Sequence, residues 1–331
     1  MSSHDALLQS SWASTRERGT LFMMRLMVLG LKLLSRPVTL PIVHLVALYF
    51  FVCGRRTRAA SRDYLRRMAR AFPQQCIASG PGASYRHYVA FAHAIVDKLD
   101  AWAGRIDYSS VVLEDFMALR AAASGARGVL VIGSHLGNLE VCRALAHFNE
   151  HVRLNVLVHN RNAALFTQVL RMAGASEVEL LQVTELDAAM ALKLKERIER
   201  GEWVVIAGDR VPVHGGRTVD VRFLGDAAPL PVGPYVLGAL LDCPVHLLFC
   251  LRRAGRYHVY FERFAERIAW RRGERDRLIG RLAQRFADRL AYYASLEPLQ
   301  WFNFYPYWRT EAGGDSRRAS ASEPSQPRRA P

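Results

Sequence analysis

Residues 128–142 read GVLVIGSHLGNLEVC, and this segment is the most informative one about the fold class. Its first six residues form a short, continuous apolar run, which is typical of a strand buried on both faces of a parallel sheet. Gly137 and Asn138 then predict a turn into a helix, with Asn138 as its N-cap. His135 is therefore expected just beyond the carboxyl end of a strand, where open α/β sheets bind their ligands.

The alternation of strand and helix continues after this stretch. Apolar runs predict strands at 154–159, 178–183, 203–207, 219–223, 245–251 and 257–264. Residues 61–125 are read as helical, and further helices are expected at 138–147, 163–173, 187–200, 233–241 and 274–296. Because the strands are continuously apolar and separated by helices, we expect an α/β fold with a mostly parallel central sheet flanked by helices.

Composition narrows the function classes. The chain has 331 residues, half of them hydrophobic, which is enough to bury a sizeable core. The five cysteines are odd in number, and they form neither a CxxC motif nor a cluster with histidines. This argues against a disulfide scaffold or a structural zinc site, and it favours a reducing compartment. No metal ion is expected.

The N-terminal third carries an apolar segment bordered by basic residues. Residues 37–54 contain no charge, and their 18 residues lie at the lower margin for a membrane span. Residues 16–70 hold 12 basic and two acidic side chains, a pattern that marks a cytoplasmic membrane face and attracts anionic lipid. A buried core helix, a single span and a helix lying in the membrane interface remain open. We expect membrane association and favour the interfacial form, since prolines interrupt the apolar run.

Four regions are therefore predicted along the chain. They are a polar N-terminus at 1–20, a membrane-associated apolar and basic segment at 21–60, an α/β domain at 61–310, and a disordered tail at 311–331. The tail has no large apolar side chain to anchor it.

Common catalytic motifs are absent from the sequence: it has no GxSxG, Walker A, GxGxxG or HExxH pattern. What remains is His135 followed five positions later by Glu140. Within one regular helix these side chains would be about 140° apart, but a turn before the helix can bring them together. The carboxylate would then hold one imidazole nitrogen and leave the other free as a base. Alternatively, Glu140 is simply favoured by the helix dipole and His135 has no catalytic role.

The segment VIGSHLGNLEVCRAL (131–145) resembles the strand–His–helix motif of the lysophospholipid acyltransferase superfamily. More closely, the chain is similar to the bacterial lipid A late acyltransferase branch, and within it to the predicted acyltransferases of aryl-polyene and pigment clusters. The resemblance covers about residues 12–308. It also rests on WASTRERGT (12–20), SRDYLRRMARAFP (61–73), VLVHNRNAALFTQVLRMAG (156–174), VVIAGDRVP (204–212) and PLQWFNFYPYW (298–308). Gly208-Asp209-Arg210 departs from the Asp-Gln usual in lipid A enzymes.

The resemblance implies roles for individual residues. His135 would be the general base and Glu140 its orienting partner. Backbone N–H groups near Gly137 and Asn138, at a helix N-terminus, would stabilise the oxyanion. Further substrate contacts are expected from residues that follow two other strands: Asn160, Arg161, Asp209 and Arg210. The two arginines are suited to a phosphate of the acceptor or of phosphopantetheine, and Asp209 to orienting Arg210.

The resemblance also implies the reaction. A membrane-associated acyltransferase of the bacterial inner membrane would move an acyl or aryl-polyene chain from an acyl carrier protein or CoA thioester to a hydroxyl or amine of a lipid or glycolipid. It would need no cofactor beyond that donor. The net charge of +15 suits an acidic carrier protein, anionic lipid, or both. The alternative is a non-catalytic membrane module that binds lipid or carrier protein; nucleic-acid binding is disfavoured, because no motif supports it.

Overall fold

The computed structural model describes residues 36–102, 106, 109, 111–142, 153–158, 178–182, 188–211 and 216–309. The expectations for the N-terminus at 1–20, for residues 21–35, for the helix at 163–173 and for the tail at 311–331 lie outside these residues.

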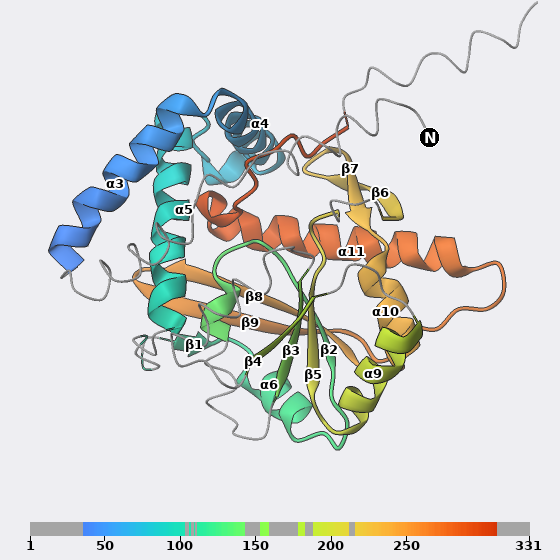
Figure 1. The fold of residues 1–331 in the computed structure, drawn as a ribbon. Helices are drawn as coiled ribbons and strands as arrows, with labels where there is room; N and C mark the ends of the chain where they lie inside the picture. Colours follow the sequence, from blue (N-terminus) through green and yellow to red (C-terminus); the bar gives the residue numbers. More distant parts are fainter. Residues whose placement is uncertain are drawn as a thin grey trace, which may run out of the picture.

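A seven-stranded sheet lies at the centre of the described structure, in the order β1-β9-β8-β2-β5-β3-β4 (Figure 1). Its strands are β1 (Val111–Leu113), β2 (Leu130–Gly133), β3 (Leu154–Val158), β4 (Val178–Gln182), β5 (Trp203–Ala207), β8 (Val245–Arg253) and β9 (Arg256–Ala265). The strands from β8 to β4 run parallel, whereas β9 is antiparallel to β8 and carries β1 parallel to itself. The predicted mostly parallel α/β sheet is confirmed.

Helices cover the sheet and extend from it (Figure 1). They are α3 (Arg36–Cys53), α4 (Arg55–Ala71), α5 (Pro81–Trp102), α6 (Phe116–Ala123), α9 (Ala188–Glu199), α10 (Gly233–Leu241) and α11 (Arg275–Leu296). Short 3-10 turns are η1 (Pro73–Gln75), η3 (Leu139–Cys142) and η4 (Pro298–Gln300). A separate antiparallel pair, β6 (Thr218–Phe223) and β7 (Asp226–Pro231), lies beside α11.

Both faces of the sheet are buried, as the apolar runs predict. In β2, Leu130 and Ile132 join the larger core with residues of α4, α10 and α11. Val129 and Val131, which point the opposite way, join a second core with Leu119 of α6. Because successive side chains of a strand alternate between faces, continuous apolar sequence is what two covered faces require.

Two short strands differ from the sequence expectations. Residues 111–113 fall within the stretch read as helical but pair with β9, since the sheet offers them an edge. Residues 226–231 were not predicted as a strand, and they contain Pro229 and Pro231, which cannot donate to a strand ladder. They are tolerated in β7 because a two-stranded sheet has only edge strands, whose outward positions need no N–H donor.

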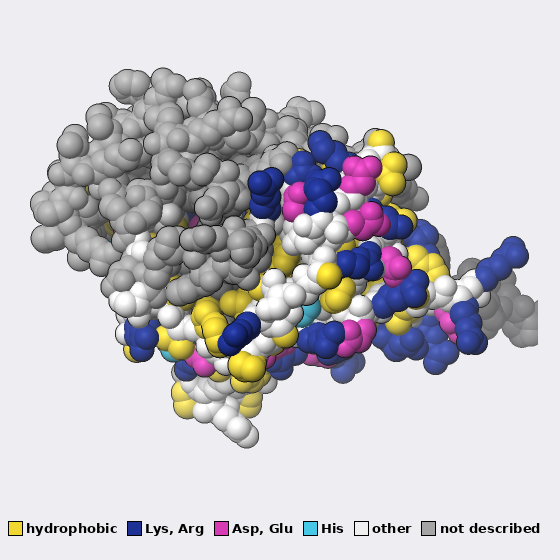
Figure 2. Space-filling model, turned by 90° about the horizontal axis from the view of Figure 1, so that it is seen from below, with side chains coloured by type: hydrophobic (Ala, Val, Ile, Leu, Met, Phe, Trp, Pro, Cys, Tyr) yellow, Lys and Arg dark blue, Asp and Glu magenta, His cyan; other side chains and the backbone are white. Residues whose placement is uncertain are grey.

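Helix α3 forms where the apolar segment predicts it. Its Val43 and Ala47 are buried, and the helix contacts α5. Most of the other apolar side chains described in this helix are exposed, including Leu45 at 66% and Val52 at 60%. Among the helices that the structure describes, none has the length and apolarity needed to cross a bilayer. On the face shown in Figure 2, basic side chains are numerous and have acidic ones between them.

Candidate active site

The register of two neighbouring strands brings His135 and Asp209 together. Strands β2 and β5 are parallel, and Gly133 pairs with Ala207 at their carboxyl ends. Two residues beyond this pair lie His135 on one strand's extension and Asp209 on the other's. The N–H of Gly208 donates to the carbonyl of Gly133 at 2.9 Å, so the pairing continues past the strand ends. The two side chains therefore meet, although 74 residues separate them.

Asp209 holds His135 by two hydrogen bonds. Its Oδ1 lies 2.9 Å from Nδ1 of the imidazole, and its Oδ2 accepts the backbone N–H of His135 at 2.9 Å. Oδ2 also accepts the indole N–H of Trp301 at 3.1 Å. The Asp209 side chain is only 1% exposed, whereas that of His135 is 37% exposed. The carboxylate is therefore fixed inside the protein while the imidazole reaches the surface of the site.

The electrostatics define the tautomer of His135. Burial alone would raise the pKa of Asp209, but the hydrogen bonds and charge from His135, and the charge of Arg210, hold that pKa below its usual range. The carboxyl is thus ionised and only accepts, so Nδ1 of His135 carries the proton. Burial, followed by the charge of Arg210, lowers the pKa of His135, and the ring is neutral at pH 7. The remaining nitrogen, Nε2, then holds a lone pair.

Gly137 lets the chain turn between the strand and η3. Its φ is +71°, and a Cβ atom there would lie 1.8 Å from the carbonyl oxygen of Cys250. The turn is held by two backbone bonds, from Gly137 N–H to the carbonyl of Gln300 at 2.8 Å and from Asn138 N–H to that of Cys250 at 2.9 Å. Both donors are therefore used within the protein. The expectation that they stabilise an oxyanion is not supported in this arrangement; substrate contact by Gly137 and Asn138 stays a prediction.

The segment 298–308 forms a wall of the site, from the far end of the sequence. Leu136 and Trp301 form an antiparallel bridge, and the Phe302 N–H donates to the carbonyl of His135 at 3.2 Å. The Tyr307 hydroxyl donates to the Asp209 carbonyl at 2.9 Å. Trp301 is 1% exposed. The sequence did not predict this indole contact to Asp209.

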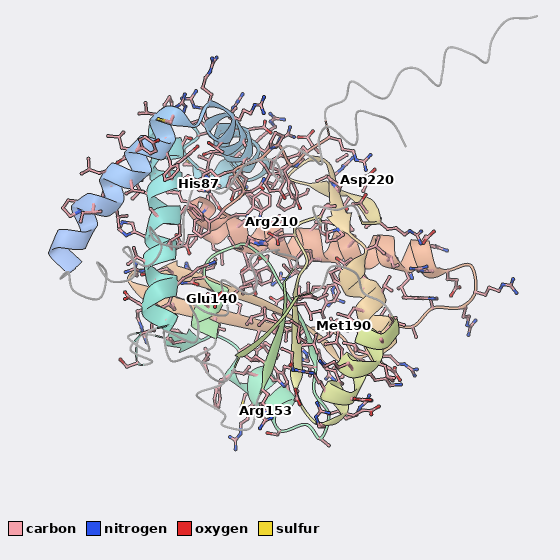
Figure 3. The ribbon with its side chains drawn as sticks, in the orientation of Figure 1. His87, Glu140, Arg153, Met190, Arg210 and Asp220 are labelled. Carbon is pink, nitrogen blue, oxygen red and sulfur yellow. The ribbon has the colours of Figure 1, made fainter. Side chains whose placement is uncertain are left out.

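Arg210 also belongs to the site. Its Nη2 donates to the Phe302 carbonyl at 2.8 Å, and its guanidinium carbon lies 5.8 Å from the centre of the Tyr305 ring. Figure 3 marks Arg210 near the carboxyl ends of the strands, with Glu140 on η3 to one side of it. The structure therefore places a fixed cation close to His135. Asp209 was expected to orient Arg210, but the structure bonds its carboxylate to His135 and Trp301. Orientation of Arg210 by Asp209 stays a prediction.

Glu140 lies in η3, as its place in a first helical turn predicts, and its N–H donates to Oδ1 of Asn138 at 3.2 Å. Asn138 is therefore the N-cap of this turn. The carboxylate that the structure gives to Nδ1 of His135 is that of Asp209. The orienting role expected for Glu140 stays a prediction. Asn160 and Arg161 lie outside the described residues, and so do their expected contacts.

Sequence reasoning found His135 but missed the partnership with Asp209. A usable signal was present, because each residue stands two positions beyond the end of a predicted apolar strand, after GVLVIG and after WVVIA. Using it required knowing that these two strands are neighbours. Within the described part of the chain, no group of His, Cys, Asp or Glu is arranged to hold a metal ion.

Comparison with known proteins identifies the family of the chain. The family model for bacterial lipid A biosynthesis acyltransferases matches residues 9–310, which includes every described element. A search of curated proteins gives no match. Since the family match spans nearly the whole chain, this protein belongs to the bacterial lipid A biosynthesis acyltransferase family and is an acyltransferase.

Proposed function

We propose that the protein transfers an acyl chain from a thioester to a hydroxyl or amine of a lipid acceptor, with His135 as general base and Asp209 as its orienting carboxylate. The observation that carries this proposal is the buried, ionised Asp209 on Nδ1 of His135, 2.9 Å away. This bond fixes the tautomer in which Nε2 can accept a proton. The family assigns acyl transfer; the catalytic roles are inferred from this geometry.

The proposed reaction proceeds by direct transfer. The acceptor O–H or N–H gives its proton to Nε2 of His135 as its oxygen or nitrogen bonds to the thioester carbonyl carbon. The resulting tetrahedral intermediate collapses with cleavage of the C–S bond, and the leaving sulfur takes the proton back from Nε2. Asp209 stabilises the imidazolium in between, as the carboxylate of a catalytic triad does. No acyl-enzyme is needed, which agrees with the absence of a nucleophile elbow from the sequence.

Arg210 is the proposed source of positive charge in this reaction. A tetrahedral oxyanion needs donors or cations placed in advance, and the N–H groups of Gly137 and Asn138 are already paired. The guanidinium of Arg210 is held by the Phe302 carbonyl and lowers the pKa of His135, so its charge acts at the reacting centre. A phosphate of the acceptor or of phosphopantetheine would be attracted by the same charge.

The donor is proposed to be an acyl carrier protein or CoA thioester, and the acceptor a lipid or glycolipid; an aryl-polyene chain is one form of the group transferred. Membrane association at the cytoplasmic face of the inner membrane is proposed from α3 and α4. Exposed apolar residues of α3 adjoin the arginine-rich α4, where Arg55, Arg56 and Arg66 are exposed. An apolar helix beside cations suits an anionic lipid surface.

The test is mass spectrometry of lipid extracts from cells that make wild-type protein or variants at equal membrane levels. Wild type is expected to produce a lipid one acyl chain heavier than its precursor, which His135→Ala abolishes. Asp209→Asn should lower its yield at least about a hundredfold, since the tautomer is lost. Glu140→Gln tests the second carboxylate in the same way. Asp220→Asn is the control, because this carboxylate on β6 is exposed and pairs with Arg309 at 3.0 Å.

Two results would contradict the proposal. Identical extracts from wild type and His135→Ala, with both proteins supporting the host pathway, would favour the non-catalytic module that binds lipid or carrier protein. Equal losses in Asp209→Asn and Asp220→Asn would show that the site carboxylate has no special role.

A further inference from the structure

A buried polar chain connects helices α4 and α5 to the active-site wall. The hydroxyl oxygens of Ser84 and Ser61 are 2.9 Å apart, and Oγ of Ser61 is 3.0 Å from Nδ1 of His87. On the other side of the ring, Nε2 of His87 lies 3.0 Å from the carbonyl oxygen of Trp301. All three polar residues, Ser61, Ser84 and His87, are 0% exposed. Buried polar groups of this kind are retained only when they are paired.

The direction of each hydrogen bond in this chain follows from its acceptors. A carbonyl oxygen only accepts, so Nε2 of His87 carries a proton and donates to Trp301. Burial lowers the pKa of His87 to about 4, so the ring is neutral and its Nδ1 accepts the Ser61 hydroxyl proton. Ser61 in turn accepts from Ser84. His87 therefore acts as a fixed donor to the backbone of Trp301.

Trp301 connects His87 to the catalytic pair, His135 and Asp209. Its carbonyl is held by His87, while its indole N–H donates to Oδ2 of Asp209 at 3.1 Å. The ring itself is packed against Tyr64, with centroids 4.9 Å apart. Asp209 then bonds to Nδ1 of His135. His87, 48 positions before His135, thus lies three contacts from the imidazole, and Figure 3 marks it on α5.

We propose that His87 is a positioning residue of the active site, which holds Trp301 so that its indole N–H restrains the Asp209 carboxylate that orients His135. The proposal rests on the proposed role of His135 and Asp209. His87 itself touches neither substrate nor the reacting atoms.

Two substitutions of similar polarity separate the contacts of His87. In His87→Gln the terminal amide reaches the position of Nε2 and can still donate to the Trp301 carbonyl. In His87→Asn the shorter amide reaches only the position of Nδ1, so the Ser61 contact is kept and the Trp301 contact is lost. Trp301→Phe removes the indole donor directly. Tyr88→Phe is the matched control, since it removes a neighbouring bond from α5 to Thr57 of α4, 2.6 Å long, outside this chain.

The primary readout is the pKa and tautomer of His135, from nitrogen NMR of histidine-labelled full-length protein in detergent. The His135 signals are assigned by their loss in His135→Ala. Three groups bear on this titration: Asp209, Arg210 and Lys98 of α5. Without the indole donor, Asp209 accepts more strongly from His135 and favours the imidazolium. His87→Asn and Trp301→Phe should therefore move the His135 pKa upward, towards about 6.5. His87→Gln and Tyr88→Phe should leave it at the wild-type value.

Acyl transfer, measured on the same variants by lipid mass spectrometry, should fall about ten- to a hundredfold in His87→Asn. The double variant of His87→Asn and Trp301→Phe should lose no more than the worse single one, because both act on one contact. A His135 pKa that is unchanged in a folded His87→Asn protein would overturn the proposal, and so would losses that multiply in the double variant. If His87→Asn does not fold, an unchanged pKa in Trp301→Phe overturns it. The NMR result does not depend on catalysis, so failure of the proposed function would be recognised separately.

Discussion

Arg210 lies close enough to His135 for its charge to oppose protonation of the imidazole. After burial, this charge is the largest influence that lowers the pKa of His135. Activity that needs a neutral ring should therefore persist below about pH 6.5, the ordinary value for histidine, and fall only in more acidic buffer.

Replacing Arg210 should change the pH below which activity is lost, which we call the acidic limit. In Arg210→Gln the lost charge favours the imidazolium, so the pKa of His135 rises and activity should decline at higher pH than in wild type. In Arg210→Lys the charge remains, so the limit should stay near the wild-type position even if the maximum rate falls. The measurement is acyl transfer across about pH 5 to 8. A limit that is the same in the Gln and Lys variants would refute the electrostatic role of Arg210.

Gly137 is required by geometry. Its φ of +71° disfavours any other residue, and an added Cβ would collide with the Cys250 carbonyl. Gly137→Ala should therefore cost more than about 2 kcal/mol and displace the loop that carries His135. Gly233→Ala, at the start of α10 where no atom lies within 4 Å of the added Cβ, should be neutral or slightly stabilising. Thermal denaturation compares the two; equal melting temperatures would contradict this account.

At the scale of elements, the sequence predicts those strands and helices whose positions are encoded by local hydrophobic periodicity. Strands such as Trp203–Ala207 and the helix Gly233–Leu241 are found at their expected bounds, because continuous apolar runs and helical spacing encode them directly. The strand Val111–Leu113 was read as helix, since three residues carry too little periodicity and only the edge of β9 defines them.

The same contrast between local sequence signals and tertiary contacts applies to the active site. His135 was predicted from its place after an apolar strand, which is local information. Its partnership with Asp209 depends on β5 lying next to β2, and strand order is set by packing of the whole sheet. The Trp301 contact is more remote still, because it requires the C-terminal segment to return to the strand ends. The sequence therefore predicted a candidate catalytic residue that follows one strand, but it did not predict the contacts between residues that follow different strands.

Helix α3 has an element-scale prediction of its own. Leu45, Tyr49 and Val52 are spaced along one face and are 66%, 57% and 60% exposed, whereas Val43 and Ala47 are buried. Changing the three exposed residues to Gln, Gln and Thr should leave folding intact. Binding to vesicles of phosphatidylglycerol and phosphatidylethanolamine should weaken about ten- to a hundredfold in sedimentation, because buried apolar area drives insertion.

The control removes similar apolar area elsewhere. It changes three exposed residues to Gln, namely Met117, Leu192 and Leu240. If this variant loses vesicle binding as strongly as the α3 variant, the membrane contact is not made by α3.

At the scale of the whole molecule, the two ends of the described chain meet around the central strands. The Tyr64 hydroxyl of α4 donates to the Pro298 carbonyl, 234 residues away, at 2.9 Å, and the Trp308 indole donates to Phe223 at 2.9 Å. Since Trp301 lies between these two contacts, the site is complete only when α4, the sheet and the C-terminal segment have packed together. Catalysis and global stability are therefore linked.

That stability should depend on pH through two buried histidines. His87 is 0% exposed, and His246 of β8 is 5% exposed and stacked on Phe261, with ring centroids 4.6 Å apart. Burial lowers the pKa of each to about 4. In the unfolded chain these histidines have a pKa near 6.5. As the pH falls from about 6.5 to about 4, the unfolded chain therefore binds protons that the folded chain does not bind. Stability is thus fully present above about 6.5 and declines towards 4, each histidine contributing about 2 kcal/mol of that loss at pH 5.

His246→Leu isolates one of these contributions. His246 lies on β8 and is not one of the residues that form the active site. Urea unfolding at pH 7.5 and at pH 5 should show a smaller difference between the two pH values in this variant, by about 2 kcal/mol. Phe261→Leu is the control: it weakens the same packing without removing a titrating group, so it should lower stability about equally at both pH values. If the acid sensitivity of His246→Leu matches that of wild type, His246 is already protonated in the folded protein or accessible to water, and the loss of stability in acid must come from other groups.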